Sequence, residues 1–414
     1  MLMSRHDDRE PILDFHTARE RLLAQAAPRV GRECLPLGEA LGRVLAAPLF
    51  ATTDIPPAPL SALDGYAIRT ADLSTQGENR LPVSQRIAAG SHAESLAPGT
   101  AARIFTGAPL PGGADAIVAQ ESTRLDGDEV CFDYRPAPWE DVKGVGSDLA
   151  RGEPLLEAGR RLRPQDLGLI ASAGIGEADV YSPLTVAVLC TGDELIEPGR
   201  ALPPGGTYNA NRYLIPAQIR SLGMNVTAVT RVADTLEATI DALQTATDTA
   251  DVVMTTGGVS VGEEDHVRAA IESMGALSIW RVNMKPGKPF TFGQIGQEKT
   301  PVIGLPGNPV SAFLNFALFA RPFLLACQGV ADDCRFTARL PAGFESPRGK
   351  PRHEFLRARV EDGVTPSVHL YPNQGSSALK SASWANGIVS IPPGTVVRKG
   401  DPVDFIPLSS FDLY

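Results

Sequence analysis

The chain has 414 residues, of which 43% are hydrophobic and 21% charged, a composition typical of a soluble globular protein with roughly two to four domains. Its net charge of −10 and its pI near 5.2 argue against nucleic-acid binding, which usually requires a basic face. Five scattered cysteines without a C-x-x-C pair, and a charged N-terminus that lacks an apolar signal core, predict reduced thiols in a cytoplasmic protein.

Helical patterns mark the start of the chain and return after a long interruption. Apolar residues recur at helical spacing in 15–23, in 37–45 and again after Pro164, which predicts a helix in each segment. We therefore expect 1–51 and 147–181 to form one helical N-terminal domain that is split by an insertion.

The inserted residues have a different character. The proline-rich passage 55–60 must be extended, and 67–134 consists of short β-like segments separated by Gly, Pro and Asp turns. An inserted β-rich domain is therefore predicted over 52–146.

The stretch 182–329 is the most regular part of the sequence, because strands alternate with helices. This pattern is typical of a doubly wound, mostly parallel sheet with helices on both faces, and Asp234 stands where a helix N-cap is needed. The longest apolar run, 310–330, contains an asparagine, an arginine and a proline, so it predicts a buried helix rather than a membrane span. The expected elements are strand 184–190, helix 211–222, strand 226–232, helix 235–245, strand 251–255, helix 264–274, strands 278–282 and 301–305, and helix 309–327.

The last segment, 330–414, again contains short strands and predicts a small β-barrel. The expected fold class is therefore multidomain α/β plus β. Its parts are a central doubly wound α/β domain, a split N-terminal helical domain, an inserted β-rich domain and a C-terminal barrel.

Polar or glycine-rich motifs follow the strands of the α/β domain. Ligands of open α/β sheets bind at the carboxyl ends of the strands, so we expect these motifs on one rim. They are 191–195, Asp234, 256–265, 283–289 and 305–309.

Two glycine-rich turns on this rim, 257–262 and 306–308, could present backbone N–H groups to a phosphate. Lys285 and Lys288, in a rigid Pro-Gly-Lys-Pro frame, would add positive charge. Each motif has a plainer explanation: the first turn could be only tight, Asn308 could be a helix N-cap, and the lysines could be solvated.

Three acidic residues, Glu194, Asp234 and Asp265, place negative charge on the same rim. Carboxylates facing a phosphate would repel it unless a cation intervenes, so the pattern predicts a hard divalent cation, Mg²⁺ in preference to Ca²⁺. Each of these residues could instead cap a helix. No His/Cys cluster has the spacing of a zinc site.

Weaker signals lie outside the α/β domain. Asp64 follows a proline-stiffened passage, Thr106 offers a hydroxyl in a Gly/Pro loop, and Asp148 lies in a Gly-Ser-Asp turn. Ser376 and Ser377 could belong to an oxyanion-holding loop. Each of these is equally compatible with an ordinary turn.

Taken together and in this order, the motifs resemble the MoeA family, the molybdopterin molybdenumtransferases or molybdenum insertases, also similar to the corresponding domain of gephyrin. The glycine loops alone are not specific, whereas the ordered set is. The matching segments are Ser61-Ala-Leu-Asp-Gly-Tyr-Ala67, Phe105-Thr-Gly-Ala108, Thr191-Gly-Asp-Glu-Leu195, Gly257-Gly-Val-Ser-Val-Gly262, Lys285-Pro-Gly-Lys-Pro289, Gly304-Leu-Pro-Gly-Asn-Pro-Val-Ser-Ala312 and Gln374-Gly-Ser-Ser377.

The resemblance implies an enzyme that transfers molybdenum from molybdate to the dithiolene sulfurs of adenylated molybdopterin and releases AMP with Mg²⁺. It also implies an elongated homodimer with the site in a cleft between subunits, and a central molybdopterin-binding domain. A molybdopterin adenylyltransferase and molybdoenzyme-maturation proteins are candidate partners, whereas neither nucleic acid nor a membrane is expected.

Residue roles follow from the same resemblance. The reaction centre would contain Asp64, Thr106, Asp148, Glu194, Asp234 and Asp265. Cation and molybdate would be handled by Glu194, Asp234 and Asp265. Phosphate and pterin would be held by Gly257, Gly258, Ser260, Gly262, Lys285, Lys288, Pro306, Gly307, Asn308, Ser376 and Ser377. The sequence departs from the family pattern at Ser147, where an acidic residue is common, and at His266, where an aromatic residue is frequent.

Two other functions are compatible with parts of the sequence. A molybdopterin adenylyltransferase or related pyrophosphate hydrolase could use the α/β motifs, but it needs about the middle third of the chain and leaves the Asp64 segment and the barrel unexplained. A non-catalytic pterin carrier or scaffold, a role that the relative gephyrin shows this fold can serve, is disfavoured by the retained carboxylates.

Overall fold

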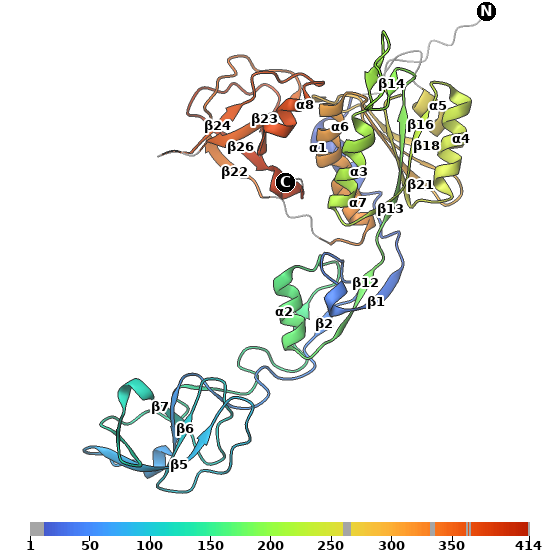
Figure 1. Cartoon of the computed structure of the whole chain (residues 1–414). Coiled ribbons are helices and arrows are strands. Elements are labelled where there is room, and N and C mark those ends of the chain that lie inside the picture. The colour runs from blue at the N-terminus through green and yellow to red at the C-terminus, as the bar shows by residue number, and fades with distance from the viewer. Residues whose placement is uncertain (1–11, 260–265, 332–335, 362, 364–365, 413–414) are drawn as a thin grey trace, which may run out of the picture.

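The computed structural model describes residues 12–259, 266–331, 336–361, 363 and 366–412. The chain is elongated, with the α/β domain and the C-terminal β domain side by side at one end (Figure 1). A small module lies in the middle, and the β-rich domain forms the other end. The predicted class, multidomain α/β plus β, is confirmed.

Six strands form the sheet of the β-rich domain, in the order β7-β4-β6-β5-β9-β8. Their bounds are β4 Gly65–Ile68, β5 Asn79–Ile87, β6 Ala101–Ile104, β7 Ala116–Ala119, β8 Arg124–Asp126 and β9 Glu129–Phe132. Successive residues of a strand point to opposite sides of the sheet, and in β4 the residues of both sides are buried. Tyr66 and Ile68 enter one buried cluster, and Ala67 enters the other.

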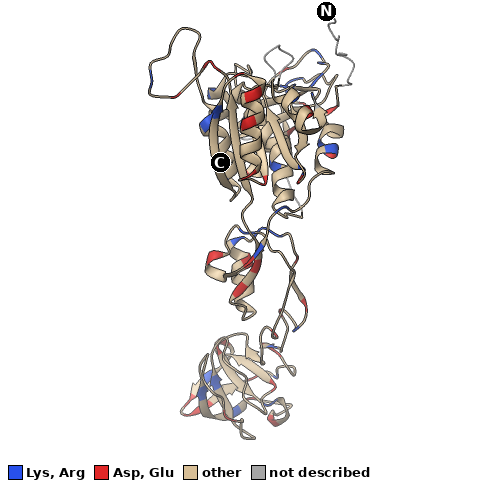
Figure 2. Cartoon of the chain, turned by 90° about the vertical axis from the view of Figure 1, so that its right-hand side faces the viewer, with Lys and Arg blue, Asp and Glu red and all other residues tan. Residues whose placement is uncertain are grey.

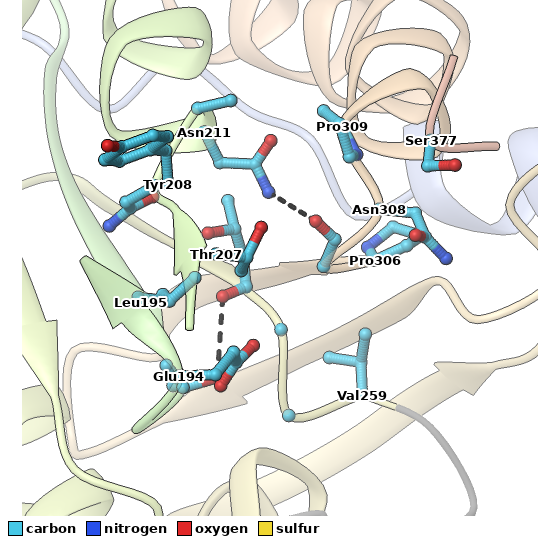
Figure 3. A pocket seen from close by; sticks show the side chains of 18 of the residues that line it. Glu194, Leu195, Thr207, Tyr208, Asn211, Val259, Pro306, Asn308, Pro309 and Ser377 are labelled. Atoms are coloured by element: carbon cyan, nitrogen blue, oxygen red, sulfur yellow. Dashed lines mark hydrogen bonds between the residues drawn. The ribbon is translucent and has the colours of Figure 1, made fainter. Parts of the chain in front are cut away.

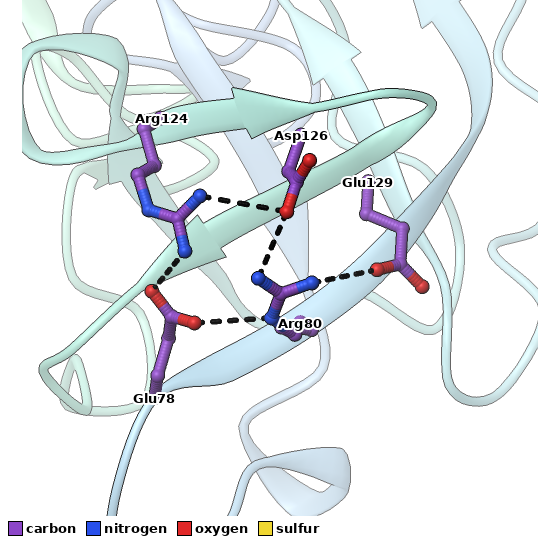
Figure 4. A network of polar contacts seen from close by, with 5 residues as sticks. All are labelled: Glu78, Arg80, Arg124, Asp126 and Glu129. Carbon is purple, nitrogen blue, oxygen red and sulfur yellow. Dashed lines mark hydrogen bonds and ion pairs between the residues drawn. The ribbon is translucent and has the colours of Figure 1, made fainter.

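The outer edge of this sheet carries a network of ion pairs (Figure 4). Arg80 lies 3.0 Å from Glu78 and 2.9 Å from Asp126, and Arg124 lies 2.7 Å from Glu78. Charged side chains of both signs occur along the whole molecule (Figure 2). Because the members of the network are exposed, their pairing contributes little to stability.

The middle module consists of two short strand pairs and helix α2 (Pro164–Ser172). Strand β1 (Arg32–Pro36) pairs with β12 (Glu177–Tyr181), and β2 (Leu49–Phe50) pairs with β11 (Pro154–Leu156). The module has a hydrophobic core of its own.

The helix predicted over 37–45 is wrong. The chain forms the short 3-10 turn η1 (Leu37–Glu39), after which Leu45 bridges to Val180 and its N–H donates to the carbonyl oxygen of Arg160 at 3.0 Å. The other early helix, α1 (Phe15–Leu23), forms as predicted but packs into the core of the α/β domain. The middle module is therefore mixed rather than helical.

Six strands form the sheet of the α/β domain, in the order β16-β13-β17-β21-β20-β18. Their bounds are β13 Thr185–Thr191, β16 Asn225–Val232, β17 Val252–Thr256, β18 Gly275–Trp280, β20 Thr291–Ile295 and β21 Thr300–Leu305. The first four in the spatial order are parallel, and β20 runs antiparallel to both neighbours. Strand β20, which has five residues and contains a glycine, was not predicted from the sequence.

Helices cover both faces of this sheet, as a doubly wound domain requires. Helices α4 (Leu236–Thr247) and α5 (His266–Met274) pack on one face, while α3 (Asn211–Ser221) and the helical segment 309–327 pack on the other. That segment is long and apolar enough to cross a membrane, but 94% of its apolar window is buried inside the protein. It is the buried core helix expected from its polar residues.

The segment 309–327 is continuous but not uniform. It begins as α6 (Pro309–Asn315), passes through the π-helical turn η4 (Phe316–Ala320) and ends as α7 (Arg321–Cys327). Its amino end follows β21 directly, so the turn between strand and helix lies at the carboxyl edge of the sheet.

The C-terminal domain is a curled sheet in the order β19-β23-β25-β26-β22, with β24 beside β23. Its strands are β19 Met284–Lys285, β22 Ala338–Pro341, β23 His353–Glu361, β24 Ser367–Leu370, β25 Gly387–Ile391 and β26 Pro402–Pro407. A bridge between Ala342 and Val368 brings the end of β22 back to β24, which gives a small barrel. Because β19 belongs to the chain between β18 and β20, this pairing ties the barrel to the α/β domain.

Candidate functional site

A cavity of about 780 Å³ opens at the carboxyl ends of β13, β17 and β21 (Figure 3). Thr191, Thr256 and Pro306, at the ends of these strands, line it, and the C-terminal domain contributes Ser377 and Leu379. Open α/β sheets bind ligands at this edge, and the volume suits a small molecule or cofactor.

The turn after β17 brings backbone groups to the cavity wall. Gly257 and Gly258 line it with φ angles of 91° and 62°, a region that favours glycine. A Cβ atom on Gly257 would lie 2.7 Å from the carbonyl oxygen of Thr191. The Gly257 N–H donates to the carbonyl oxygen of Leu305 at 3.0 Å, which fixes this turn against the turn after β21.

The turn after β21 forms the neighbouring part of the wall with Pro306, Gly307 and Asn308. Asn308 occupies the N-cap position of α6, but its side chain makes no capping hydrogen bond. Capping therefore does not account for the Asn308 side chain. The Val310 N–H donates to the carbonyl oxygen of Ser376 at 3.0 Å, so the barrel loop with the two serines docks beside this turn.

A buried arginine, not predicted from the sequence as part of the site, supports the barrel loop. Arg357, 1% exposed, donates from Nε to Ser381 Oγ at 2.9 Å and from Nη2 to the carbonyl oxygen of Gly375 at 3.1 Å. Burial lowers the pKa of Arg357 to about 10, and the structure describes no carboxylate paired with it. A buried cation without a counter-ion favours anions nearby.

Glu194 lines the cavity from the loop after β13 (Figure 3). The structure describes no partner for its carboxylate, while its backbone carbonyl accepts the Thr207 N–H at 2.9 Å. A Cβ atom on Gly192 would lie 2.6 Å from a carboxylate oxygen of Glu194, so a glycine is needed for this close approach. Arg231 holds the loop by donating to the carbonyl oxygen of Asp193 at 2.8 Å.

Asp234 lines the same cavity just beyond the end of β16. One carboxylate oxygen accepts the Asp193 N–H at 3.0 Å. The expectation that Asp234 caps α4 is wrong, because Thr235 is the N-cap and accepts the Ala238 N–H at 3.2 Å. The Asp234 carboxylate is therefore available to a ligand.

Three assigned residues, Asp265, Ser260 and Gly262, lie outside the described residues. Within the part of the chain that the structure describes, no three His, Cys, Asp or Glu side chains gather as a metal site. Mg²⁺ is commonly held by one or two carboxylates, with water and substrate phosphates completing its shell. Glu194 and Asp234, both hard oxygen donors on one cavity, fit that requirement.

The two assigned lysines do not line the cavity. Lys285 lies on β19 with its Nζ 3.6 Å from Oε1 of the buried Glu354, which also pairs with Lys350 at 2.8 Å. Lys288 is half-buried, and the next residue, Pro289, does line the cavity. Lys288 is therefore next to a residue of the cavity wall, whereas Lys285 is held beside the barrel.

Asp64 and Thr106 meet in the β-rich domain. Asp64 Oδ1 accepts the backbone N–H of Thr106 at 2.8 Å and its Oγ1–H at 2.7 Å. The backbone hydrogen bond, then the hydroxyl and the charge of Arg103, lower the pKa of the Asp64 carboxyl. The β-rich domain forms the opposite end of the chain from the α/β domain (Figure 1), so one chain does not bring this pair to Glu194.

Asp148 is exposed in the segment between the β-rich domain and the middle module. Its backbone N–H donates to the carbonyl oxygen of Ile55 at 2.9 Å. The structure therefore separates the assigned residues into a group at the cavity and a group away from it.

The segment between β13 and α3 forms a flap that was not predicted from the sequence. Strands β14 (Leu195–Ile196) and β15 (Thr207–Tyr208) pair there, and Leu202 and Tyr208 remain exposed at the cavity. Asn211, nearly buried at the start of α3, also lines it. The loop is rich in proline and glycine, which gives no pattern that predicts a strand pair. The polar residue Asn211 at the start of α3 was the one sequence feature that could have indicated a site there.

Three family descriptions match consecutive parts of this chain. They are the MoeA N-terminal region (domain I and II) over 13–174, a probable molybdopterin binding domain over 187–326, and the MoeA C-terminal region (domain IV) over 337–408. The chain belongs to the MoeA family. These matches include both terminal regions, which an isolated adenylyltransferase unit would leave unexplained.

Named relatives agree with the MoeA assignment. The molybdopterin molybdenumtransferase of Haemophilus influenzae is 38% identical over 320 residues, which cover 77% of this chain and 78% of the relative. Molybdopterin molybdenumtransferase 2 of Mycobacterium tuberculosis is 36% identical over 389 residues, covering 91% and 95%. This MoeA chain is therefore a transferase with a role in molybdenum cofactor biosynthesis.

A solved MoeA structure has the same architecture. The molybdopterin biosynthesis moeA protein of Pyrococcus horikoshii OT3 superposes with a TM-score of 0.85 at 28% identity, covering 96% of this chain and 100% of that chain. The likeness extends over the β-rich, middle, α/β and barrel regions, since nearly all of both chains is included.

Proposed function

We propose that this chain inserts molybdate into adenylated molybdopterin and releases AMP in an Mg²⁺-dependent reaction, giving the molybdenum cofactor. One observation carries the proposal: Glu194 and Asp234 share a cavity with two turns suited to phosphate, at 257–258 and 306–308. The names of the relatives, molybdopterin molybdenumtransferase, support the same substrate class.

The phosphates of the substrate would be held by the backbone N–H groups of the two turns. Lys285 and Lys288 lie in the segment that reaches the cavity wall at Pro289. Together with Ser376 and Ser377 from the barrel loop, they would complete the phosphate and pterin contacts. Positive charge there would offset the charge that develops on the bridging phosphate oxygen as AMP leaves.

Mg²⁺ would be held by Glu194 and Asp234, together with Asp265, and when bound it supplies Lewis-acid stabilisation of phosphate oxygens. In this arrangement the carboxylates bind and orient, rather than attack the substrate. Molybdate is the second substrate and would reach the dithiolene sulfurs in the same cavity.

The proposal includes a homodimer. The β-rich domain and the segment that follows it carry Asp64, Thr106 and Asp148 and lie away from the α/β domain of the same chain (Figure 1), so we assign these residues to the cavity of a second copy related by a two-fold axis. Sedimentation equilibrium should give twice the chain mass of 43.8 kDa, and a monomer at assay concentration would contradict this part.

The test of the reaction is release of AMP from adenylated molybdopterin, with and without molybdate and Mg²⁺. Glu194→Gln and Asp234→Asn keep the side-chain shape but remove the charge, and both should abolish molybdate-dependent release. Tight substrate binding without AMP release by the wild type would indicate a carrier. ATP-dependent adenylation of free molybdopterin would indicate an adenylyltransferase.

We place the reaction in the cytoplasm. Its substrate must come from an adenylyl-transfer reaction, so a molybdopterin adenylyltransferase is a candidate partner, and a molybdoenzyme-maturation protein would take the product.

A further inference from the structure

Asn211 makes a contact at the cavity that the assigned roles do not use. It is the first residue of α3, is 6% exposed and lines the cavity. Its Nδ2 donates to the carbonyl oxygen of Gly307 at 2.8 Å (Figure 3). A carbonyl oxygen can only accept, so the amide nitrogen must be the atom that faces it.

The other half of this amide is unused. The Oδ1 atom of Asn211 is buried, and the structure describes no hydrogen-bond partner for it. A buried polar atom without a partner costs stability, and an apolar side chain at this position would avoid that cost. The single bond to Gly307 is therefore the feature of Asn211 that calls for an explanation.

The bond to Gly307 sets the direction of a peptide group. In a planar trans peptide the carbonyl and the following N–H point in opposite directions, so holding the Gly307 carbonyl also aims the Asn308 N–H. Both residues line the cavity, and the structure describes no acceptor for either N–H. A Cβ on Gly307 would lie 3.6 Å from the Cα of Gly257, so this peptide packs against the other glycine turn.

We propose that Asn211 is a positioning residue, which locks the 307–308 peptide with its N–H toward a phosphate oxygen of the ligand and its carbonyl away from it. A peptide turned the other way would present a carbonyl oxygen, which repels a phosphate. This inference rests on the proposed function, because that function supplies the phosphate.

AMP and adenosine differ only in the phosphate, so comparing their binding isolates the contribution of the phosphate contact. Isothermal titration calorimetry measures the dissociation constant of each ligand. Asn211→Ala should weaken AMP binding by about tenfold, the loss of a hydrogen bond to a charged group, and leave adenosine binding unchanged. Asn211→Asp should weaken AMP binding further, because its carboxylate repels the Gly307 carbonyl.

Gln218 provides a matched control. It lies seven residues further along α3, is also buried at 4% exposure, and its two side-chain polar atoms have no partner among the described residues. It does not line the cavity, so Gln218→Ala should bind AMP as the wild type does. Thermal unfolding of every variant identifies any that are misfolded.

Three results would overturn the inference: wild-type AMP affinity in both Asn211 variants, equal losses for AMP and adenosine, or a wild type that does not bind AMP. The proposed function fails separately. The wild type could bind AMP through its phosphate in an Asn211-dependent way and still not release AMP from adenylated molybdopterin. That result would support the role of Asn211 and contradict the proposed function.

Discussion

Charged side chains cluster at both ends of this molecule, but the two clusters are built differently. At the outer edge of the β-rich domain, Arg80 and Arg124 are each matched by carboxylates at 2.7–3.0 Å (Figure 4). At the cavity, the structure describes no partner for the Glu194 carboxylate (Figure 3). Asp234 accepts one backbone N–H, that of Asp193.

The charges of the outer network are neutralised by other side chains of the same domain, whereas the cavity carboxylates are available to a ligand. Paired surface charges satisfy one another and contribute little to stability. Carboxylates that line a cavity without an ion-pair partner are candidates for binding a ligand or a cation. The two clusters should therefore respond to mutation in opposite ways.

The largest effect is expected at the cavity carboxylates. Glu194→Gln and Asp234→Asn should lower the rate of AMP release by at least about a hundredfold, with no loss of melting temperature, because no described ion pair is broken. Asp126→Asn in the outer network is the control and should keep full activity. Equal losses of activity in all three variants would remove the distinction between the clusters.

A smaller but still large effect is expected from Gly192→Ala. The new methyl group would occupy space 2.6 Å from a carboxylate oxygen of Glu194, so the carboxylate must move while its charge remains. We expect kcat/KM for AMP release to fall about tenfold to a hundredfold, with a weaker dependence on Mg²⁺. Wild-type kinetics would show that the position of Glu194 does not matter.

His353 differs from both clusters, because it is a titratable group that burial keeps neutral rather than a charge with or without a partner. Burial and the nearby His16 lower its pKa to about 4, so below its ordinary pKa the unfolded chain binds a proton that the folded chain does not. Its stability contribution is therefore complete above about pH 6.5 and is lost as the pH falls toward 4.

His353→Phe should remove this pH dependence while retaining the ring stack on Phe355, whose centroid is 4.5 Å away. Urea unfolding should show the wild type losing about 2 kcal/mol more than the variant between about pH 7 and about pH 5. Comparing the two pH values cancels the constant cost of the lost hydrogen bond to Ser390. Identical pH profiles would contradict burial of a neutral ring.

Thr106→Val tests the group that lies away from the cavity. The substitution keeps the backbone donor to Asp64 and removes the hydroxyl donor, so the pKa of the Asp64 carboxyl should rise part of the way to its ordinary value. Carboxyl-carbon NMR titration measures it. Because folding lowers the pKa of Asp64, this carboxyl stabilises the fold at pH values above its ordinary pKa, and the stabilisation is lost as the pH falls through the lowered pKa. Thr106→Val reduces the shift, so the stability of the variant should depend less on acid pH.

The smallest effect is expected from Arg80→Met in the outer network. Its ion pairs are exposed, so the melting temperature should change by at most about 2 °C and AMP release should not change. A large loss of either would show that this network is more than a solvated edge.

The rim of the α/β domain could be predicted because its constraints are local. Gly257 must be glycine for its own φ angle and for the contact with Thr191, and such positions are visible in the sequence as glycine turns after strands. The cap of α4 was misplaced by one residue, from Thr235 to Asp234, because both residue types can cap and sequence alone does not distinguish neighbours.

Long-range contacts could not be predicted. The apolar spacing of 37–45 suits a helix, but those residues line a core formed with strands from 154–181, and periodicity alone does not separate the two outcomes. The pairing of Lys285 with Glu354, through β19 and β23, joins residues whose proximity has no local signature. The same holds for Asn211 and Gly307.

In the proposed homodimer, one chain would supply the cavity with Glu194 and a second copy would complete it with Asp64. The direct measurement is AMP release by a purified mixed dimer of an Asp64→Asn chain and a Glu194→Gln chain, each inactive as a homodimer. In the mixed dimer one of the two cavities keeps both native residues, so about half of the wild-type activity should return. A mixed dimer that forms but stays inactive would contradict the account.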